Sequence, residues 1–277
     1  MLSIMRADLY RIFREPTFYI TFGIIAGVFI LVRGVGMLGI TIGGSTMNAQ
    51  GTMLTNQFNG LQAPFVMMAL MDFLAYFLLV VVMFTAARDF STNAARSVLS
   101  SDISRTEYYF SKLLTAVMFC AALALFSVIV PTIAGSFAGC FGGELSGEYI
   151  MSVLKPFGAQ LFLLICLACV GVFLAITTKS NIATTGFFLA FVLVPDAVIQ
   201  YYLDFAIYRA GVLDAAVQYN EGLGELSVYS ITGSIRNMLF AAELPSATII
   251  SALAIGATYA VASTTAGILL FKRSGIK

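Results

Sequence analysis

Histidine is absent from the 277 residues of this sequence. This removes the most common metal ligand and general base, and with it His-dependent intramembrane proteases, haem ligation by His and Ser-His hydrolysis. Charged residues are scarce, at 10% against about 25% in soluble domains. Hydrophobic residues make up 60% of the chain and the mean hydropathy is +0.94, so the composition predicts an integral membrane protein.

Cysteine is also rare, and its four positions give no disulfide framework. Cys120, Cys166 and Cys169 fall in apolar runs, and Cys140 lies in a short loop without an obvious partner. The C-x-x-C spacing of Cys166 and Cys169 is accompanied by no other ligand in its apolar window, so we interpret these thiols as packed side chains. We expect no metal, no cofactor and no catalytic residue in this chain.

Six apolar stretches are long enough to cross a hydrocarbon core of about 30 Å as helices. The apolar runs are continuous rather than alternating, which excludes a membrane barrel. The sequence therefore predicts an all-α integral membrane protein with six transmembrane helices in a single domain over residues 1–277. The expected spans are residues 17–40, 65–87, 113–136, 157–178, 182–203 and 246–271.

Lys and Arg are distributed unevenly between the two sides. Eleven of them fall in the termini and one set of loops, against three in the opposite set. Because basic loops stay in the cytoplasm, we expect both termini there, in a multi-pass protein of the cytoplasmic membrane of a bacterium. The loop 204–245 is then extracellular, and its short apolar pieces fit a re-entrant helix, an interfacial helix or an external cap. The net charge of +1 gives no reason to expect nucleic acid as a partner.

Residues 1–16 have an amphipathic pattern. Leu2, Met5, Leu9, Ile12 and Phe13 share one helical face, and the opposite face carries Asp8, Arg11 and Arg14. The pattern predicts an interfacial helix with an ion pair between Asp8 and Arg11, ended by a bend at Pro16. The alternative is simply a charged start to the first span.

Residues 88–112 form the only sizeable internal loop on the cytoplasmic side. Phe90, Ala94, Ala95, Val98 and Leu99 can share one face of a short helix parallel to the membrane. A second helix is expected to start after Ser104 as N-cap, with Glu107 completing a capping box. An ordinary basic connector is the alternative.

This loop resembles the corresponding loop in permeases of type-2 ABC exporters, especially those of the bacteriocin-immunity and peptide-export branch. The resemblance rests on Asp89-Phe90, Arg96, Leu99-Ser100, Ser104-Arg105, Tyr108-Tyr109 and Lys112, and also on the opening IMRADLYRIFREPTFYI and the six-span plan. Asn93-Ala94 departs from the Gly-Thr that is usual in that family.

The resemblance implies a coupling helix that docks on a separate ATPase subunit, with the N-terminal helix packed nearby. The coupling residues it implies are Asp89, Phe90, Arg96, Val98, Leu99, Ser104, Arg105, Tyr108 and Lys112. The sequence has no G-x-x-x-x-G-K-[ST] motif, so ATP and Mg are expected on two partner ATPase subunits. A second permease copy or paralogue would complete an exporter for an amphipathic or antimicrobial peptide, serving export or self-immunity.

Three charged residues interrupt the expected spans: Arg33, Asp72 and Asp196. Charges at membrane depth are costly, so we hypothesise that Arg33 pairs with Asp72 or Asp196 to help close an external gate. Equally open is that these side chains snorkel to the outer interface. Pro195 predicts a kink or break beside the gate.

Small residues in the first and last spans suggest close helix packing. They are Gly23 and Gly27 in the first span, and Ala252, Gly256 and Ala260 in the last. Other functions also stay open: a stand-alone channel or secondary carrier, or an ABC exporter that moves lipid or a hydrophobic drug.

Overall fold

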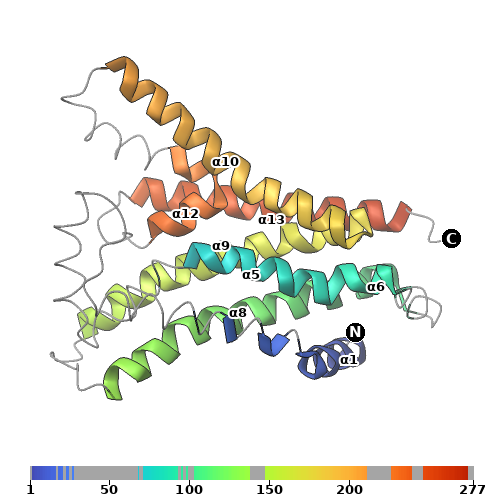
Figure 1. Ribbon diagram of the computed structural model, residues 1–277. Helices are drawn as coiled ribbons and strands as arrows, with labels where there is room; N and C mark the ends of the chain where they lie inside the picture. Colours follow the sequence, from blue (N-terminus) through green and yellow to red (C-terminus); the bar gives the residue numbers. More distant parts are fainter. Residues whose placement is uncertain are drawn as a thin grey trace.

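The computed structural model is built from helices (Figure 1). It describes residues 2–16, 18–20, 23–24, 27, 68, 71–92, 95, 98, 103–137, 147–210, 226–238 and 246–273. No strand occurs among them, so the all-α prediction is confirmed for this part of the chain.

The long elements follow the apolar runs of the sequence, because each run favours a helix that satisfies its own backbone hydrogen bonds. In chain order the elements are α1 (Leu2–Arg14), α5 (Met71–Val82), the π-helical turn η1 (Met83–Ala87), α6 (Arg88–Ser91), α8 (Arg105–Phe137), α9 (Gly147–Thr178), α10 (Asn181–Ala210), the 3₁₀ turn η2 (Ser227–Tyr229), α12 (Ile231–Asn237) and α13 (Ser246–Arg273).

Four helices in the described part of the chain are long and apolar enough to cross a membrane: α8, α9, α10 and α13. They correspond to the last four expected spans. The first expected span, 17–40, lies almost wholly outside the described residues, and the described part of the second forms α5 and η1. The protein is thus a helical membrane protein with four candidate spans, and six spans are not confirmed.

Helix α9 is the centre of the bundle. It packs against α13, α8, α10, α12 and α5, and 61% of its apolar window is buried. The corresponding windows of α10 and α13 are only 17% buried. Leu163, Leu167 and Val172 from α9 join the main core cluster, while α10 and α13 leave most of their surface to the surroundings.

Close packing between α9, α8 and α13 depends on glycine. A Cβ on Gly256 would lie 2.7 Å from Leu163, and one on Gly267 would lie 2.5 Å from the Tyr109 hydroxyl. The expected small face of the last span is confirmed at Gly256, and Gly267 extends it by three turns. In the first span, a Cβ on Gly23 or Gly27 would meet nothing within 4 Å, so no close packing is described there.

The region expected to be an extracellular loop contributes to the bundle itself. Helix α10 runs on to Ala210 and continues through Pro195, so of the kink or break predicted there, the break does not occur. Further along, α12 is buried over Ile231–Ile235 and packs against α9 and α5. This short helix is therefore inserted between longer helices, as a re-entrant piece would be, and the described part forms no external cap.

The two ends of the bundle differ. Helix α1, the start of α8 and the end of α13 lie together at one end, and α12 lies toward the other (Figure 1). We call the first the basic end, because Arg11, Lys112, Lys179 and Lys272 lie there.

Candidate functional site

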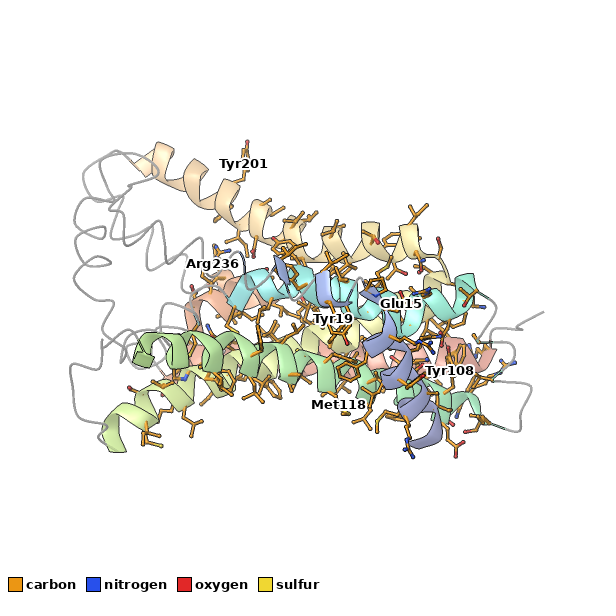
Figure 2. The ribbon with its side chains drawn as sticks, turned by 60° about the horizontal axis from the view of Figure 1, so that its bottom comes forward. Glu15, Tyr19, Tyr108, Met118, Tyr201 and Arg236 are labelled. Carbon is orange, nitrogen blue, oxygen red and sulfur yellow. The ribbon has the colours of Figure 1, made fainter. Side chains whose placement is uncertain are left out.

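Three helices meet at the basic end through buried charges. Asp8 and Arg11 come from α1, Asp89 comes from α6, and Tyr108 and Lys112 come from the first turns of α8. We call these five residues the charged joint. Figure 2 shows α1 lying across α8 at the end where Tyr108 is labelled.

Lys112 is the centre of the charged joint. Its Nζ lies 2.7 and 2.6 Å from the two carboxylate oxygens of Asp8 and 2.5 Å from Oδ2 of Asp89. Its side chain is only 1% exposed, and its ammonium lies 5.2 Å from the centre of the Tyr108 ring. A buried ammonium needs anions nearby and an acceptor for each of its N–H groups, and the carboxylates of Asp8 and Asp89 meet both needs.

Asp89 links α6 to both neighbouring helices. Its Oδ1 lies 2.6 Å from Nη1 of Arg11, and its Oδ2 accepts a hydrogen bond of 2.9 Å from the Tyr108 hydroxyl. Arg11 also reaches Asp8 at 3.4 Å, which confirms the predicted i,i+3 pair. Two carboxylates thus face two cations, and the joint is close to electrically neutral.

Asp8 is the least favourably placed of these charges. Burial raises the pKa of its carboxyl above the usual value, and the nearby Lys112 opposes this rise without cancelling it. The carboxylate therefore depends on Lys112 for its stability. Loss of that cation would leave a buried negative charge with few partners.

The position of Asp8 corrects the sequence prediction for α1. Asp8 was expected on a polar face, opposite the apolar residues. It is instead 5% exposed and lies between Ile4 and Ile12 on the face that packs against the bundle, whereas Phe13 is 51% exposed. Positions 4, 8 and 12 are successive turns of one helical face. This face packs against the bundle because it carries the ion pair with Lys112, and part of the predicted apolar face, including Phe13, stays exposed.

Two further contacts tie the same end together. Arg88 pairs with Glu15 at 2.5 Å, just beyond the end of α1. Arg105 donates hydrogen bonds to the carbonyls of Phe271 and Lys272, at 3.1 and 2.9 Å. A guanidinium at a helix C-terminus satisfies carbonyls that have no partner within the helix, so Arg105 fixes the end of α13 to the start of α8.

The expected loop 88–112 is shorter in the structure. Helix α6 continues to Ser91 and α8 begins at Arg105. Ser104 accepts a hydrogen bond of 3.2 Å from the backbone N–H of Glu107, which confirms it as the N-cap. The connection between the two helices is therefore residues 92–104, in which Ala95 and Val98 are helical; we call it the basic loop after its Arg96.

Several expected coupling residues face inward rather than toward a partner. Asp89, Tyr108 and Lys112 are no more than 2% exposed. Phe90 packs edge-on against the rings of Tyr108 and Phe271, at 6.4 and 6.2 Å between centroids, and Val98 contacts the same core. The three buried side chains can position the basic loop from inside the bundle, whereas Phe90 and Val98 are only half-buried. Arg96 and Leu99 lie outside the described residues.

The proposed gate is described only at Asp196. Arg33 lies outside the described residues, and the side chain of Asp72 is not described. Asp196 accepts hydrogen bonds from the hydroxyls of Ser230 and Thr232, the latter at 2.8 Å. The guanidinium of Arg236, labelled in Figure 2, lies 3.9 Å away.

This second polar cluster holds α12 in place and was missed from the sequence. Ser230 is the N-cap of α12, and Gln160 of α9 donates to the carbonyls of Ile235 and Met68 at 2.8 and 3.1 Å. A glutamine in the middle of an apolar run was the available signal, because a buried amide needs polar partners from another segment.

Both clusters consist of ion pairs and hydrogen bonds. Among the described residues, no group of three or more Cys, Asp or Glu side chains is arranged to hold a metal ion. What the charged joint can do is mechanical: it makes α1, α6 and α8 move together.

Comparison with known proteins adds one relationship. A family of proteins of unknown function, DUF2705, matches residues 46–276. The chain belongs to this family. The match covers α5 through α13, and therefore includes Asp89, Tyr108 and Lys112 of the charged joint but not α1. No curated protein matches the DUF2705 chain.

Proposed function

We propose that this DUF2705 chain is the transmembrane permease subunit of an ABC exporter. In this proposal two copies, or this chain and a paralogue, form the path for an amphipathic or antimicrobial peptide across the cytoplasmic membrane of a bacterium. Two separate ATPase subunits bind ATP and Mg and drive transport. The observation that carries the proposal is the charged joint, which fixes both ends of the basic loop.

A subunit driven by a separate ATPase needs a stiff connection between the docking loop and the spans. The basic loop starts one residue after α6, which carries Asp89, and it ends at α8, which carries Lys112. Both residues bind α1, and Arg105 adds α13 to the same assembly. Force on the basic loop would therefore move four helices together instead of being absorbed by one flexible connection.

The resemblance of the loop to type-2 ABC exporter permeases supports the same function. In such a system, nucleotide-driven closure of two ATPases would press two basic loops together and open the path on the other side. The inward-facing joint residues would transmit this motion, and Arg96 and Leu99 would contact the ATPase.

A stand-alone channel or carrier has one observation in its favour. Asp196 and the inserted helix α12 place a carboxylate, three hydroxyl or amide groups and a short helix within the bundle. Interrupted helices beside a buried charge are a feature of carrier binding sites. An exporter of lipid or of a hydrophobic drug is the variant of the first proposal with a different cargo.

The test is copurification with an ATPase. The tagged chain is coexpressed with an ABC ATPase encoded in the same genome, extracted in mild detergent and assayed for ATP hydrolysis. Wild type should retain the ATPase, and Leu99→Asp should release it because a charge then enters the apolar contact. The matched control is Ser180→Asp, which adds the same charge in the α9–α10 turn, at a position directly before α10 where Asp is well tolerated.

The two outcomes are distinct. Retention by wild type and by Ser180→Asp, with loss in Leu99→Asp, supports an ABC permease with its joint in the basic loop. A well-folded chain that retains no ATPase in any variant would overturn the proposal in favour of a channel or carrier.

A further inference from the structure

An apolar groove lies between α9, α10 and α13, away from both polar clusters. Its volume is about 410 Å³, within the range of small-molecule sites. The wall residues on which the argument depends are Phe173, Leu174, Phe187, Phe191, Tyr259 and Ala266. The rings of Phe191 and Tyr259 meet edge to face at 5.5 Å.

The groove opens toward the surroundings of the bundle. It is bordered by the two helices that are least covered by the rest of the protein, and Phe187 on its rim is 60% exposed. The hydroxyl of Ser263 in its wall donates to the carbonyl of Ala260, so the wall presents no unsatisfied polar group there. Such a surface suits a hydrocarbon chain.

Basic residues follow the groove at one end. Leu174 precedes Lys179 by about 7.5 Å of helix, and Ala266 precedes Lys272 and Arg273 by about 9 to 10 Å. Lys272 and Arg273 are both exposed, but only Arg273, seven residues after Ala266, lies on the side of α13 that lines the groove. A phospholipid whose acyl chain lies in the groove would therefore have its phosphate level with these cations, and basic pockets between spans on the cytoplasmic side bind anionic headgroups.

The backbone at Lys179 gives an independent indication. Lys179 has a φ of 52°, and its N–H caps α9 by donating to Ala175 at 3.1 Å. Glycine is the usual residue at this left-handed position because it has no Cβ to strain. Lysine carries a conformational cost at this position, which fits a use for its side chain.

We propose that the groove between α9, α10 and α13 binds an acyl chain of an anionic glycerophospholipid from the leaflet at the basic end, with its phosphate held by Lys179 and Arg273. The cations Lys179 and Arg273 at its end complement a phosphate, and this charge complementarity commits the groove to an anionic lipid. The proposal does not depend on the transport function.

The sequence offers a clean probe, because it contains no tryptophan. A Phe187→Trp variant places a single fluorophore on the rim of the groove. The full-length protein is reconstituted in vesicles that contain dibrominated phosphatidylglycerol or dibrominated phosphatidylcholine, and quenching gives the relative affinity of each lipid at that site. Phe110→Trp is the matched control. Phe110 is 42% exposed near the start of α8, at the basic end of the bundle, and it lies outside the groove.

The expected result is preferential quenching of Phe187→Trp by the anionic lipid. About 1 kcal/mol for each basic residue near an anionic surface corresponds to about fivefold in affinity, so we expect a preference of at least about fivefold. Phe110→Trp should show little preference. Adding Arg273→Gln to the probe should remove most of the preference, while Lys155→Gln at the far end should not.

Lys179→Gly separates a lipid role from a structural one. Glycine relieves the left-handed strain, so the melting temperature should stay the same or rise while the preference for the anionic lipid falls. Equal quenching of Phe187→Trp by both lipids would overturn the proposal. Protection from both lipids would also overturn it, because the groove would then be covered by protein.

Discussion

Replacing Lys112 by methionine should release α1 from the bundle. Methionine is a flexible, unbranched side chain of similar length, so the change chiefly removes the charge. Asp8 and Asp89 would then share one cation, Arg11, which is about one-third exposed and lies 3.4 Å from Asp8. The buried carboxylates would repel each other across the space that Lys112 had filled.

The expected cost follows from the burial of the three side chains. The side chains alone of Lys112, Asp8 and Asp89 are 1%, 6% and 3% exposed, so water screens their interaction very little. Removing one partner of such a buried group typically costs about 3–5 kcal/mol. That corresponds to an increase of about two to four orders of magnitude in the population with α1 undocked.

Cysteine labelling measures this population. Ile12 is 4% exposed on the docked face of α1, so a thiol introduced by Ile12→Cys should react with a water-soluble maleimide only when α1 opens. The background is Cys140→Ser, which leaves only the buried thiols of Cys120, Cys166 and Cys169. Labelling in Lys112→Met should be faster by about 100-fold or more, up to the rate of a fully undocked helix.

A double variant tests whether the effect of Lys112→Met comes from the lost charge. Asp8→Asn combined with Lys112→Met restores charge balance between Asp89 and Arg11, so labelling should return most of the way to wild type. Lys155→Met, at an exposed site at the other end, should change labelling less than about twofold. A Lys112→Met variant that labels like wild type, or a double variant no better than Lys112→Met alone, would refute the reasoning.

Three other perturbations test the rest of the structure. Gly267→Ala should lower the free energy of unfolding by about 1–3 kcal/mol, because the new Cβ would lie 2.5 Å from the Tyr109 hydroxyl. Gly158→Ala is the control, since a Cβ there would meet nothing within 4 Å and should leave stability unchanged. Thermal unfolding in detergent compares the two variants. Asp196→Ala should lower the free energy of unfolding by about 1–3 kcal/mol, because the hydroxyls of Ser230 and Thr232 lose the carboxylate to which they donate. Limited proteolysis should then cut near α12. Unchanged digestion would contradict the role of Asp196. Because the pKa of Asp8 is raised on folding, its contribution to stability is fully present below its unfolded pKa of about 3.9 and is lost as pH rises through the folded value. Wild type should therefore gain melting temperature relative to Asp8→Asn as pH falls from neutral, and a constant difference would contradict the raised pKa.

Local sequence signals predicted the positions where helices begin and the pairs that lie close along the chain. Ser104 as N-cap and the pair of Asp8 with Arg11 are examples, since each depends on residues three positions apart. The last four expected spans have the form of helices because their apolar runs leave the backbone no other partner. Gly256 also signalled close packing by its size.

Contacts between segments that are distant in the sequence could not be predicted from local signals. The sequence predicted Asp8 on the exposed face of α1. In the structure it is buried, because it pairs with Lys112, which is 104 positions further along the chain. The same is true of α12, where the N-cap hydroxyl of Ser230 donates to Asp196 and the carbonyl of Ile235 accepts from Gln160, each on another helix. In each case a buried polar group needs a partner, and the sequence shows the need without showing the partner.

By itself, therefore, the sequence determined that this chain is a helical membrane protein, since hydropathy and backbone hydrogen bonding act on each segment separately. Only the tertiary structure decided which face of α1 docks, that α12 is inserted into the bundle, and that Asp89, Tyr108 and Lys112 face inward. These features depend on desolvation and charge pairing, whose free energies are set by groups that meet only after the helices have packed.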